Sequence, residues 1–132
     1  MILADSSVWI DYFRGVICWQ TDMLDQLLQT EPVLMADLIF AEVLPGFSSD
    51  KDFAKAKTLL SGLPFRQIGG YEVALQSALN YRILRKRGIT VRKTIDVFIG
   101  TFCIINRYTL LHNDIDFEPL VKHLALKTVK QA

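Results

Sequence analysis

Short apolar runs without polar alternation constrain the fold of this chain more than any other feature. Three of them, 1–4, 33–36 and 108–111, are too short for buried helices, and stretches with helical spacing of apolar residues separate them. Such runs indicate strands that are covered on both faces, as in a parallel sheet. With weaker strand candidates at 65–68 and 126–129, right-handed crossovers predict an α/β/α sandwich around a central, mostly parallel sheet of four to five strands.

The stretches between the runs carry apolar residues at helical spacing and are bounded by glycine, proline or capping residues. The last long helix is apolar on almost every side, which predicts burial between other elements, and Thr94 is expected to cap it. No linker or repeat divides the chain, so we expect a single domain over 1–132. We expect helices at about 8–14, 20–29, 38–44, 50–60, 71–87, 95–107 and 117–123.

Composition excludes several classes of protein. Of the 132 residues, 51% are hydrophobic and 22% are charged, and the net charge of +1 excludes a disordered chain or a uniformly basic nucleic-acid-binding tail. No apolar stretch approaches the roughly 18 residues of a membrane span, and the chain reaches Asp5 without a basic leader, so we expect neither a membrane span nor a secretory signal. Two cysteines, Cys18 and Cys103, are too few for a metal knuckle or a disulfide scaffold, which favours the reducing cytoplasm.

Acidic residues lie where the carboxyl ends of the predicted strands would meet. Asp5 directly follows the first run, and Asp114 and Asp116 follow the third. Asp96 lies in the first turn of the apolar helix, and Glu42 lies inside an apolar segment after the second run, where an unpaired carboxylate is costly. Because ligand sites of parallel α/β sheets lie beyond the carboxyl ends of the strands, we expect these five acids to meet in one crevice.

A divalent cation would remove the repulsion between five carboxylates in one crevice. Oxygen ligands favour a hard cation such as Mg²⁺ or Mn²⁺, and no histidine or cysteine cluster has the spacing of a zinc site. The acids also have a structural interpretation, with Asp5 as a helix cap, Asp96 at a positive helix N-terminus, and Asp114 and Asp116 in a turn. The residues alone leave both interpretations open.

Basic residues are concentrated in the second half of the chain. Residues 1–66 contain nine acids and five bases, whereas residues 67–132 contain five acids and ten bases. The segment 81–93 is either a solvated helix face followed by a loop or a contact surface for a polyphosphate. It contains six bases and no acid: Arg82, Arg85, Lys86, Arg87, Arg92 and Lys93.

Four segments that carry these acids, 3–10, 41–46, 94–100 and 110–117, follow one another at a characteristic spacing. In this order they resemble the PIN-domain ribonucleases, and specifically the VapC-type toxins of bacterial and archaeal toxin–antitoxin pairs. The resemblance spans almost the whole chain. It implies a PIN-like α/β/α sandwich and an endoribonuclease that hydrolyses RNA phosphodiester bonds with a carboxylate-bound Mg²⁺ or Mn²⁺.

The resemblance also implies roles for individual residues. Asp5 and Asp96 are the positions most directly tied to the metal, with Asp116 beside the site, and Ser7 matches the small hydroxyl residue that supports the first aspartate. Thr94 is expected to support the start of the last long helix. The implied catalytic and metal-binding quartet is Asp5, Glu42, Asp96 and Asp114.

An acidic centre needs positive charge near an RNA backbone. We therefore expect Arg92 and Lys93, which directly precede the segment 94–100, to contact the substrate, and Arg82 to contribute. Two positions depart from the family pattern. Many members have Thr or Ser in place of His112, and many have Ala in place of Gly100.

The resemblance implies protein partners as well. VapC-type proteins commonly form homodimers and are silenced by a VapB-type antitoxin, with which they form higher-order complexes. An antitoxin helix would suit an apolar groove near the stripes at 23–28 and 38–44, although both stripes are also candidates for the core.

Two other functions compete with this interpretation. A phosphohydrolase or phosphoacceptor would use Asp5 as a nucleophile, but it normally needs a second aspartate two residues on or a partner lysine after a late strand. This chain has Ser7 at the first position and no lysine soon after Leu111. A catalytically silent PIN-like module would bind RNA or a partner only. Degenerate members of that kind usually lose acids, and this chain keeps all of them.

Overall fold

A four-stranded sheet in the order β3-β2-β1-β4 forms the centre of the computed structural model, which describes all residues 1–132. All neighbouring strands are parallel, and Leu3 of β1 lies opposite Leu34 of β2 and Leu110 of β4. The carboxyl ends of the strands therefore lie along one edge of the sheet. The strands are β1 (Ile2–Ala4), β2 (Val33–Ala36), β3 (Phe65–Arg66) and β4 (Thr109–Leu111).

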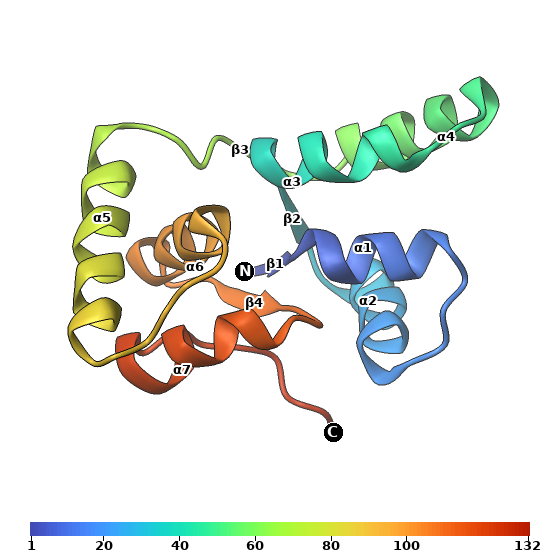
Figure 1. Cartoon of the computed structure of the whole chain (residues 1–132). Helices are drawn as coiled ribbons and strands as arrows, with labels where there is room; N and C mark the ends of the chain where they lie inside the picture. Colours follow the sequence, from blue (N-terminus) through green and yellow to red (C-terminus); the bar gives the residue numbers. More distant parts are fainter.

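Helices cover both faces of this sheet. In Figure 1, α1 and α2 lie on one side of the strands, and α5 and α6 lie on the other. This arrangement confirms the predicted α/β/α sandwich. The helices are α1 (Ser6–Phe13), α2 (Trp19–Thr30), α3 (Asp37–Val43), α4 (Asp50–Ser61), α5 (Tyr71–Lys86), α6 (Thr94–Asn106) and α7 (Glu118–Leu124), with short 3-10 turns η1 (Leu44–Gly46) and η2 (Ile115–Phe117). None of them is both long enough and apolar enough to cross a bilayer.

The unbroken apolar runs correspond to strands that are buried on both faces. Leu3, Leu34, Met35 and Leu110 have no exposed surface, which explains why successive residues of these strands are apolar rather than alternating. Burial at the centre of the sheet also fixes the register, because a slip of one residue would change which side chains fill each layer.

Helix α6 is enclosed by its neighbours, as its apolar sequence predicts. Seven of its 13 residues are buried, and it packs against α5, α7 and β4. At Gly100, an added Cβ would run into the Leu120 side chain of α7. The end of the Leu120 side chain thus occupies the space that an alanine at position 100 would need.

Two expectations at element ends are wrong. Thr94 does not cap α6 but is its first residue, because Lys93 takes the N-cap position and no side chain caps the helix. The segment 126–129 is not a fifth strand. It contacts β4 through a single parallel bridge between Leu110 and Thr128. In this bridge the Leu110 amide donates to the carbonyl of Lys127, and the Val129 amide donates to the carbonyl of Leu110.

Candidate metal centre

Asp5 stands where β1 ends and α1 begins. Its backbone N–H donates to the carbonyl of Leu111 on β4 at 2.8 Å, and its Oδ2 accepts from the amide (3.1 Å) and the hydroxyl (2.7 Å) of Ser7. The Ser7 hydroxyl in turn accepts from the backbone N–H of Asn113 at 3.1 Å. These bonds tie the ends of β1 and β4 together and hold the Asp5 carboxylate in one orientation.

The other oxygen of Asp5 is buried without a partner, and Asp96 has the same feature. Asp5 is 3% exposed and Asp96 is 5% exposed, and neither Oδ1 of Asp5 nor Oδ2 of Asp96 has a hydrogen-bond donor. Desolvation by burial raises the pKa of the Asp5 carboxyl, and burial together with the Asp5 charge raises the pKa of Asp96 to about 7. Buried carboxylate oxygens without a donor are unfavourable unless a proton or a cation neutralises them.

Asp96 also belongs to a cluster with two further aspartates from η2 and the segment before it. Asp96, Asp114 and Asp116 each offer a carboxylate oxygen within 4.8 Å of the others. Oδ1 of Asp114 accepts from the backbone N–H of Asp116 at 2.9 Å. The backbone N–H of Asp114 donates to Nδ1 of His112 at 3.2 Å.

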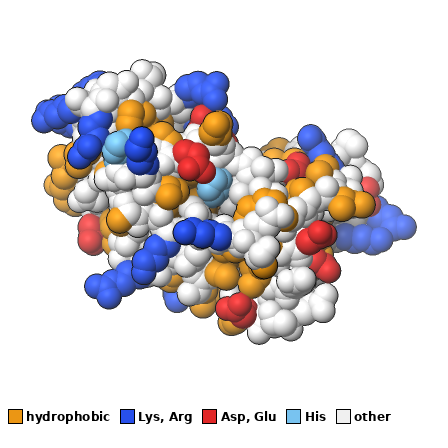
Figure 2. All heavy atoms as spheres, turned by 90° about the horizontal axis from the view of Figure 1, so that it is seen from below, with side chains coloured by type: hydrophobic (Ala, Val, Ile, Leu, Met, Phe, Trp, Pro, Cys, Tyr) orange, Lys and Arg blue, Asp and Glu red, His pale blue; other side chains and the backbone are white.

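Two basic side chains form ion pairs with the outer acids of this cluster. Nζ of Lys93 lies 3.2 Å from Oδ2 of Asp114, and Nη2 of Arg92 lies 3.0 Å from Oδ1 of Asp116. Desolvation acts to raise the pKa of Asp114, but the bonds from the Asp116 amide and from Lys93 outweigh it and lower this pKa. On the face of the molecule drawn in Figure 2, Asp or Glu side chains lie beside a histidine, and Lys and Arg side chains surround them on several sides.

Glu42 lies on α3 at the rim of this group. The sequence suggests a buried carboxylate, and that expectation is wrong, because Glu42 is exposed while its helix neighbours Ile39 and Val43 take the core-facing positions. Desolvation and the nearby Asp5 charge raise the pKa of Glu42, and the Ser6 hydroxyl and Lys93 lower it.

Electrostatic coupling joins all five acids. The charge of Asp5 raises the pKa of Glu42 and of Asp96. The charge of Asp114 raises the pKa of Asp5, and the charge of Asp116 raises the pKa of Asp96. The structure therefore brings the five predicted acids to one edge of the sheet, and it adds two bases to them. Their roles in metal binding and catalysis stay predictions.

The basic run divides into two parts. Arg82 is exposed on α5 and takes part in neither ion pair, and the other α5 bases are also exposed, as on a solvated helix face. Arg92 and Lys93, in contrast, reach the acidic cluster from the loop before α6. Thr94 is exposed and makes no capping bond.

Sequence reasoning missed the polar residues that adjoin the centre. Nδ2 of Asn113 donates to Oδ2 of Asp11 on α1 at 3.1 Å, and Nε2 of Gln20 on α2 donates to Oδ1 of Asn113 at 3.2 Å. Asn113 thus joins the end of β4 to two helices. Asn113 lies between His112 and Asp114 in the sequence, but its contacts are with residues about 100 positions away.

Known proteins share the sequence pattern and the fold of this chain. No protein-family model matches the chain. The chain is 30% identical over 124 residues to VapC ribonuclease Mb1587 of Mycobacterium bovis and, to the same extent, to ribonuclease VapC11 of Mycobacterium tuberculosis, covering 92% of this chain and 92% of each relative.

Solved structures with similar folds come from VapBC complexes. Chains of VapBC2 from Rickettsia felis and of VapBC from Salmonella typhimurium, both solved bound to DNA, superpose with TM-scores of 0.76 and 0.75 at 15% and 10% identity. VapBC-1 from nontypeable Haemophilus influenzae matches with a TM-score of 0.71 at 19% identity. These matches cover at least 98% of both chains and show a VapC-like PIN fold. Given also its identity to the mycobacterial proteins, the chain belongs to the VapC ribonuclease family.

Proposed function

We propose that this protein is a metal-dependent endoribonuclease and the toxin of a VapBC-type toxin–antitoxin pair. The observation that carries the proposal is the pair of buried carboxylate oxygens on Asp5 and Asp96 that no donor in the protein satisfies. Membership of the VapC ribonuclease family supports the reaction class, and the surrounding acids and bases supply the groups that hydrolysis of a phosphodiester needs.

The residues present fit a hard divalent cation. Every candidate ligand is a carboxylate oxygen, the donor type that Mg²⁺ and Mn²⁺ favour. Asp5 and Asp96 would hold the ion, and Asp114, Asp116 and Glu42 would complete the site directly or through water. A bound ion lowers the pKa of water and neutralises charge on the phosphate.

The side chains around the ion would divide the remaining work. Glu42, which combines exposure at the rim with a raised pKa, orients the attacking water and accepts a proton from it. The water oxygen would form a bond to phosphorus in line with the breaking P–O3′ bond, and the leaving 3′-oxygen would take a proton from solvent, which gives a 5′-phosphate and a 3′-hydroxyl. Arg92 and Lys93 bind the flanking phosphates once these bases leave the acids they pair with.

An RNA cleavage assay with sequencing of the 5′ ends tests this proposal. We expect EDTA-treated protein to be inactive, Mg²⁺ or Mn²⁺ to restore cleavage, and the products to carry 5′-phosphates. Cleavage that persists in excess EDTA, or a failure to cleave any cellular RNA with metal bound, would contradict the proposal. The second result would favour the silent RNA-binding or partner-binding module.

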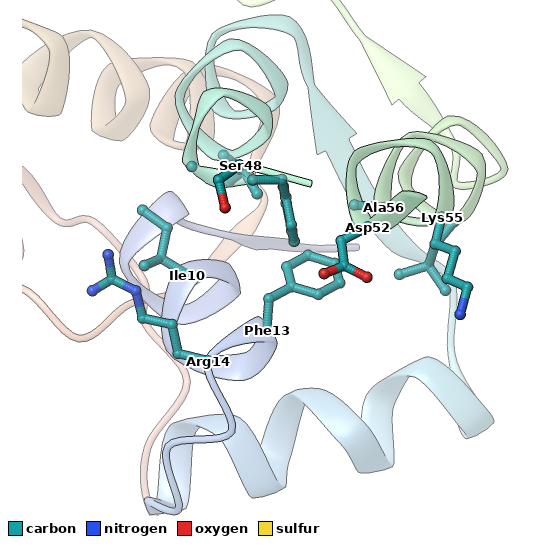
Figure 3. Close-up of a pocket in the computed structure, with 11 residues that line it drawn as sticks. Ile10, Phe13, Arg14, Ser48, Asp52, Lys55 and Ala56 are labelled. Atoms are coloured by element: carbon teal, nitrogen blue, oxygen red, sulfur yellow. The ribbon is translucent and has the colours of Figure 1, made fainter. Parts of the chain in front are cut away.

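We also propose that a VapB-type antitoxin binds an apolar pocket between α1, η1 and α4. The two stripes expected to form its groove are largely core, since Leu24 and Leu27 of α2 and Ile39 and Val43 of α3 are buried. A pocket of about 590 Å³ lies instead beside them, and Figure 3 shows Phe13 and Ile10 facing it between charged side chains at its rim. An amphipathic helix of the antitoxin suits such a groove. Its lining residues are Ile10, Phe13, Arg14, Val43, Gly46, Phe47, Ser48, Asp52, Lys55, Ala56 and Leu59.

We further propose that the protein forms a homodimer and acts in the cytoplasm. Helix α5 carries four exposed apolar side chains at intervals of four residues, which form one stripe along the helix. Burial of this stripe against a second copy would remove it from water. Light scattering should show a dimer that Leu79→Glu dissociates. The stripe consists of Tyr71, Leu75, Leu79 and Ile83.

A further inference from the structure

A second pocket borders the acidic centre on the side of α2. It has a volume of about 520 Å³, within the range of small-ligand sites in proteins. The first two residues of α2, Trp19 and Gln20, form one wall, and the segment 112–115 forms another. The segment 128–131 lines a third side of the pocket. Asp114 belongs both to this lining and to the acidic cluster, so a group bound here lies next to the reaction site.

The lining combines an aromatic ring with side-chain amides. Trp19 is half-buried and packs against the core, which leaves a large, rigid ring at the pocket wall. The amides of Gln20 and Asn113 bond to each other through one donor and one acceptor. Each amide has two N–H donors and an oxygen with two lone pairs, so Gln20 keeps a free donor and its whole oxygen for a ligand.

These groups match the chemistry of a nucleobase. Bases splayed from single-stranded RNA stack on aromatic side chains and form hydrogen bonds along their edges. A glutamine amide offers one donor and one acceptor side by side, as recognition of a base edge needs. The exposed side chain of Ile115 adds apolar surface at the mouth of the pocket.

We propose that this pocket is a base-recognition subsite that takes one unstacked nucleobase of the RNA next to the scissile phosphate, an assignment that rests on the proposed ribonuclease function. Trp19 supplies the stacking surface, and Gln20 reads the base edge. Asn113 is a positioning residue, since its contacts to Ser7, Asp11 and Gln20 hold the pocket wall against the metal centre. The subsite would select the cleavage position, whereas the acids and bases of the centre act on any phosphodiester.

Binding of free nucleosides tests the subsite without catalysis. Nucleosides lack phosphate, so they probe the base pocket and not the basic side chains. The indole N–H of Trp19 reports on the pocket by NMR, and the buried Trp9 is an internal control in the same spectrum. We expect saturable shifts of the Trp19 signal for at least one of the four nucleosides, with no change at Trp9. Absence of a saturable Trp19 shift for all four nucleosides would overturn the inference.

Matched variants of α2 then connect binding to cleavage. Gln20→Ala should weaken nucleoside binding and reduce kcat/KM on the preferred RNA sequence by about tenfold, while sequences with another base at that position change little. Gln29→Ala, an exposed glutamine outside the pocket on the same helix, is the control and should match the parent. An identical cleavage profile for Gln20→Ala and the parent would reject the subsite while leaving the ribonuclease intact. A parent that binds nucleosides at Trp19 but cuts no RNA would instead reject the ribonuclease proposal.

Discussion

The ammonium group of Lys93 lies 3.2 Å from Oδ2 of Asp114, so a base of the chain itself pairs with a carboxylate that we propose for the metal centre. Lys93 and a divalent cation therefore compete for the same oxygen. The pairing is exposed to solvent on the lysine side, which keeps its contribution small and allows the lysine to move to an RNA phosphate.

Replacement of Lys93 should separate these two roles. Lys93→Ala removes the competitor, so we expect the affinity for Mn²⁺ to rise about two- to fivefold, in line with the strength of an exposed ion pair, while RNA affinity falls. Titration calorimetry at a pH above 7 measures the first effect. Lys86→Ala, at the exposed end of α5, is the control; Mn²⁺ affinity that falls in Lys93→Ala would argue against competition.

Asp96 should make stability depend on pH. Its pKa is raised from 3.8 to about 7 in the folded protein, so the folded state holds this proton more tightly than the unfolded chain. The free energy of unfolding should therefore decline as the pH rises between these values, by at most about 4 kcal/mol for this group, and level off above them. Urea unfolding in EDTA at several pH values measures the decline.

A matched pair of variants assigns this pH dependence. Asp96→Asn should make the decline shallower and leave the part that comes from Asp5 and Glu42, whose pKa values are also raised, whereas Asp22→Asn, an exposed aspartate on α2, should leave the decline unchanged. Saturating Mg²⁺ should stabilise the parent most at the higher pH values, where the carboxylates are ionised. Equal slopes for the parent and Asp96→Asn would mean that Asp96 does not titrate in this range.

Arg92 should contribute to RNA affinity through charge alone. We expect Arg92→Ala to weaken binding and to reduce the slope of log K against log salt by about 0.7, the value for one phosphate contact with a single strand. Filter binding of RNA to an inactive variant over a range of salt concentrations measures this slope. Arg87→Ala, at the exposed residue that follows α5, should keep the parental slope, and an unchanged slope for Arg92→Ala would exclude the contact.

The close approach of α6 and α7 at Gly100 should make this position intolerant of a side chain. Gly100→Ala places a methyl group against the buried Leu120, so we expect a loss of about 1–3 kcal/mol in the free energy of unfolding. In the double variant, Leu120→Val removes the clashing carbon and should recover part of that loss, as a double-mutant cycle would show. Full additivity of the two changes would contradict this contact.

The sequence predicts the strands that local apolar runs form and the acidic residues at their ends. It does not predict the contacts between segments that are distant in the sequence. The apolar runs predicted the bounds of β1, β2 and β4 almost to the residue. Because Asp5 and Asp114 follow strands of a parallel sheet, their position at one edge of the sheet was also predictable. The two-residue strand β3 and the lone bridge at Thr128 depend on which neighbour each segment meets. Propensity carries little information about such short pairings.

The same distinction applies to the candidate site. The exposure of Glu42 depends on which face of α3 packs against the core. The apolar residues around Glu42 in the sequence do not indicate that face. The pairing of Lys93 with Asp114 joins residues 21 positions apart through a loop, and charge clustering alone could not distinguish it from a solvated surface. The pocket beside Trp19 likewise forms from three segments distant in sequence.

Asp5 and Asp96 should bind one divalent cation between them. Anomalous diffraction from crystals grown with Mn²⁺ tests it most directly, with Asp96→Asn crystals as the control. We expect one strong peak within coordinating distance of the Asp5 and Asp96 carboxylates that is lost in the variant. A peak elsewhere, or none at saturating Mn²⁺, would contradict the account.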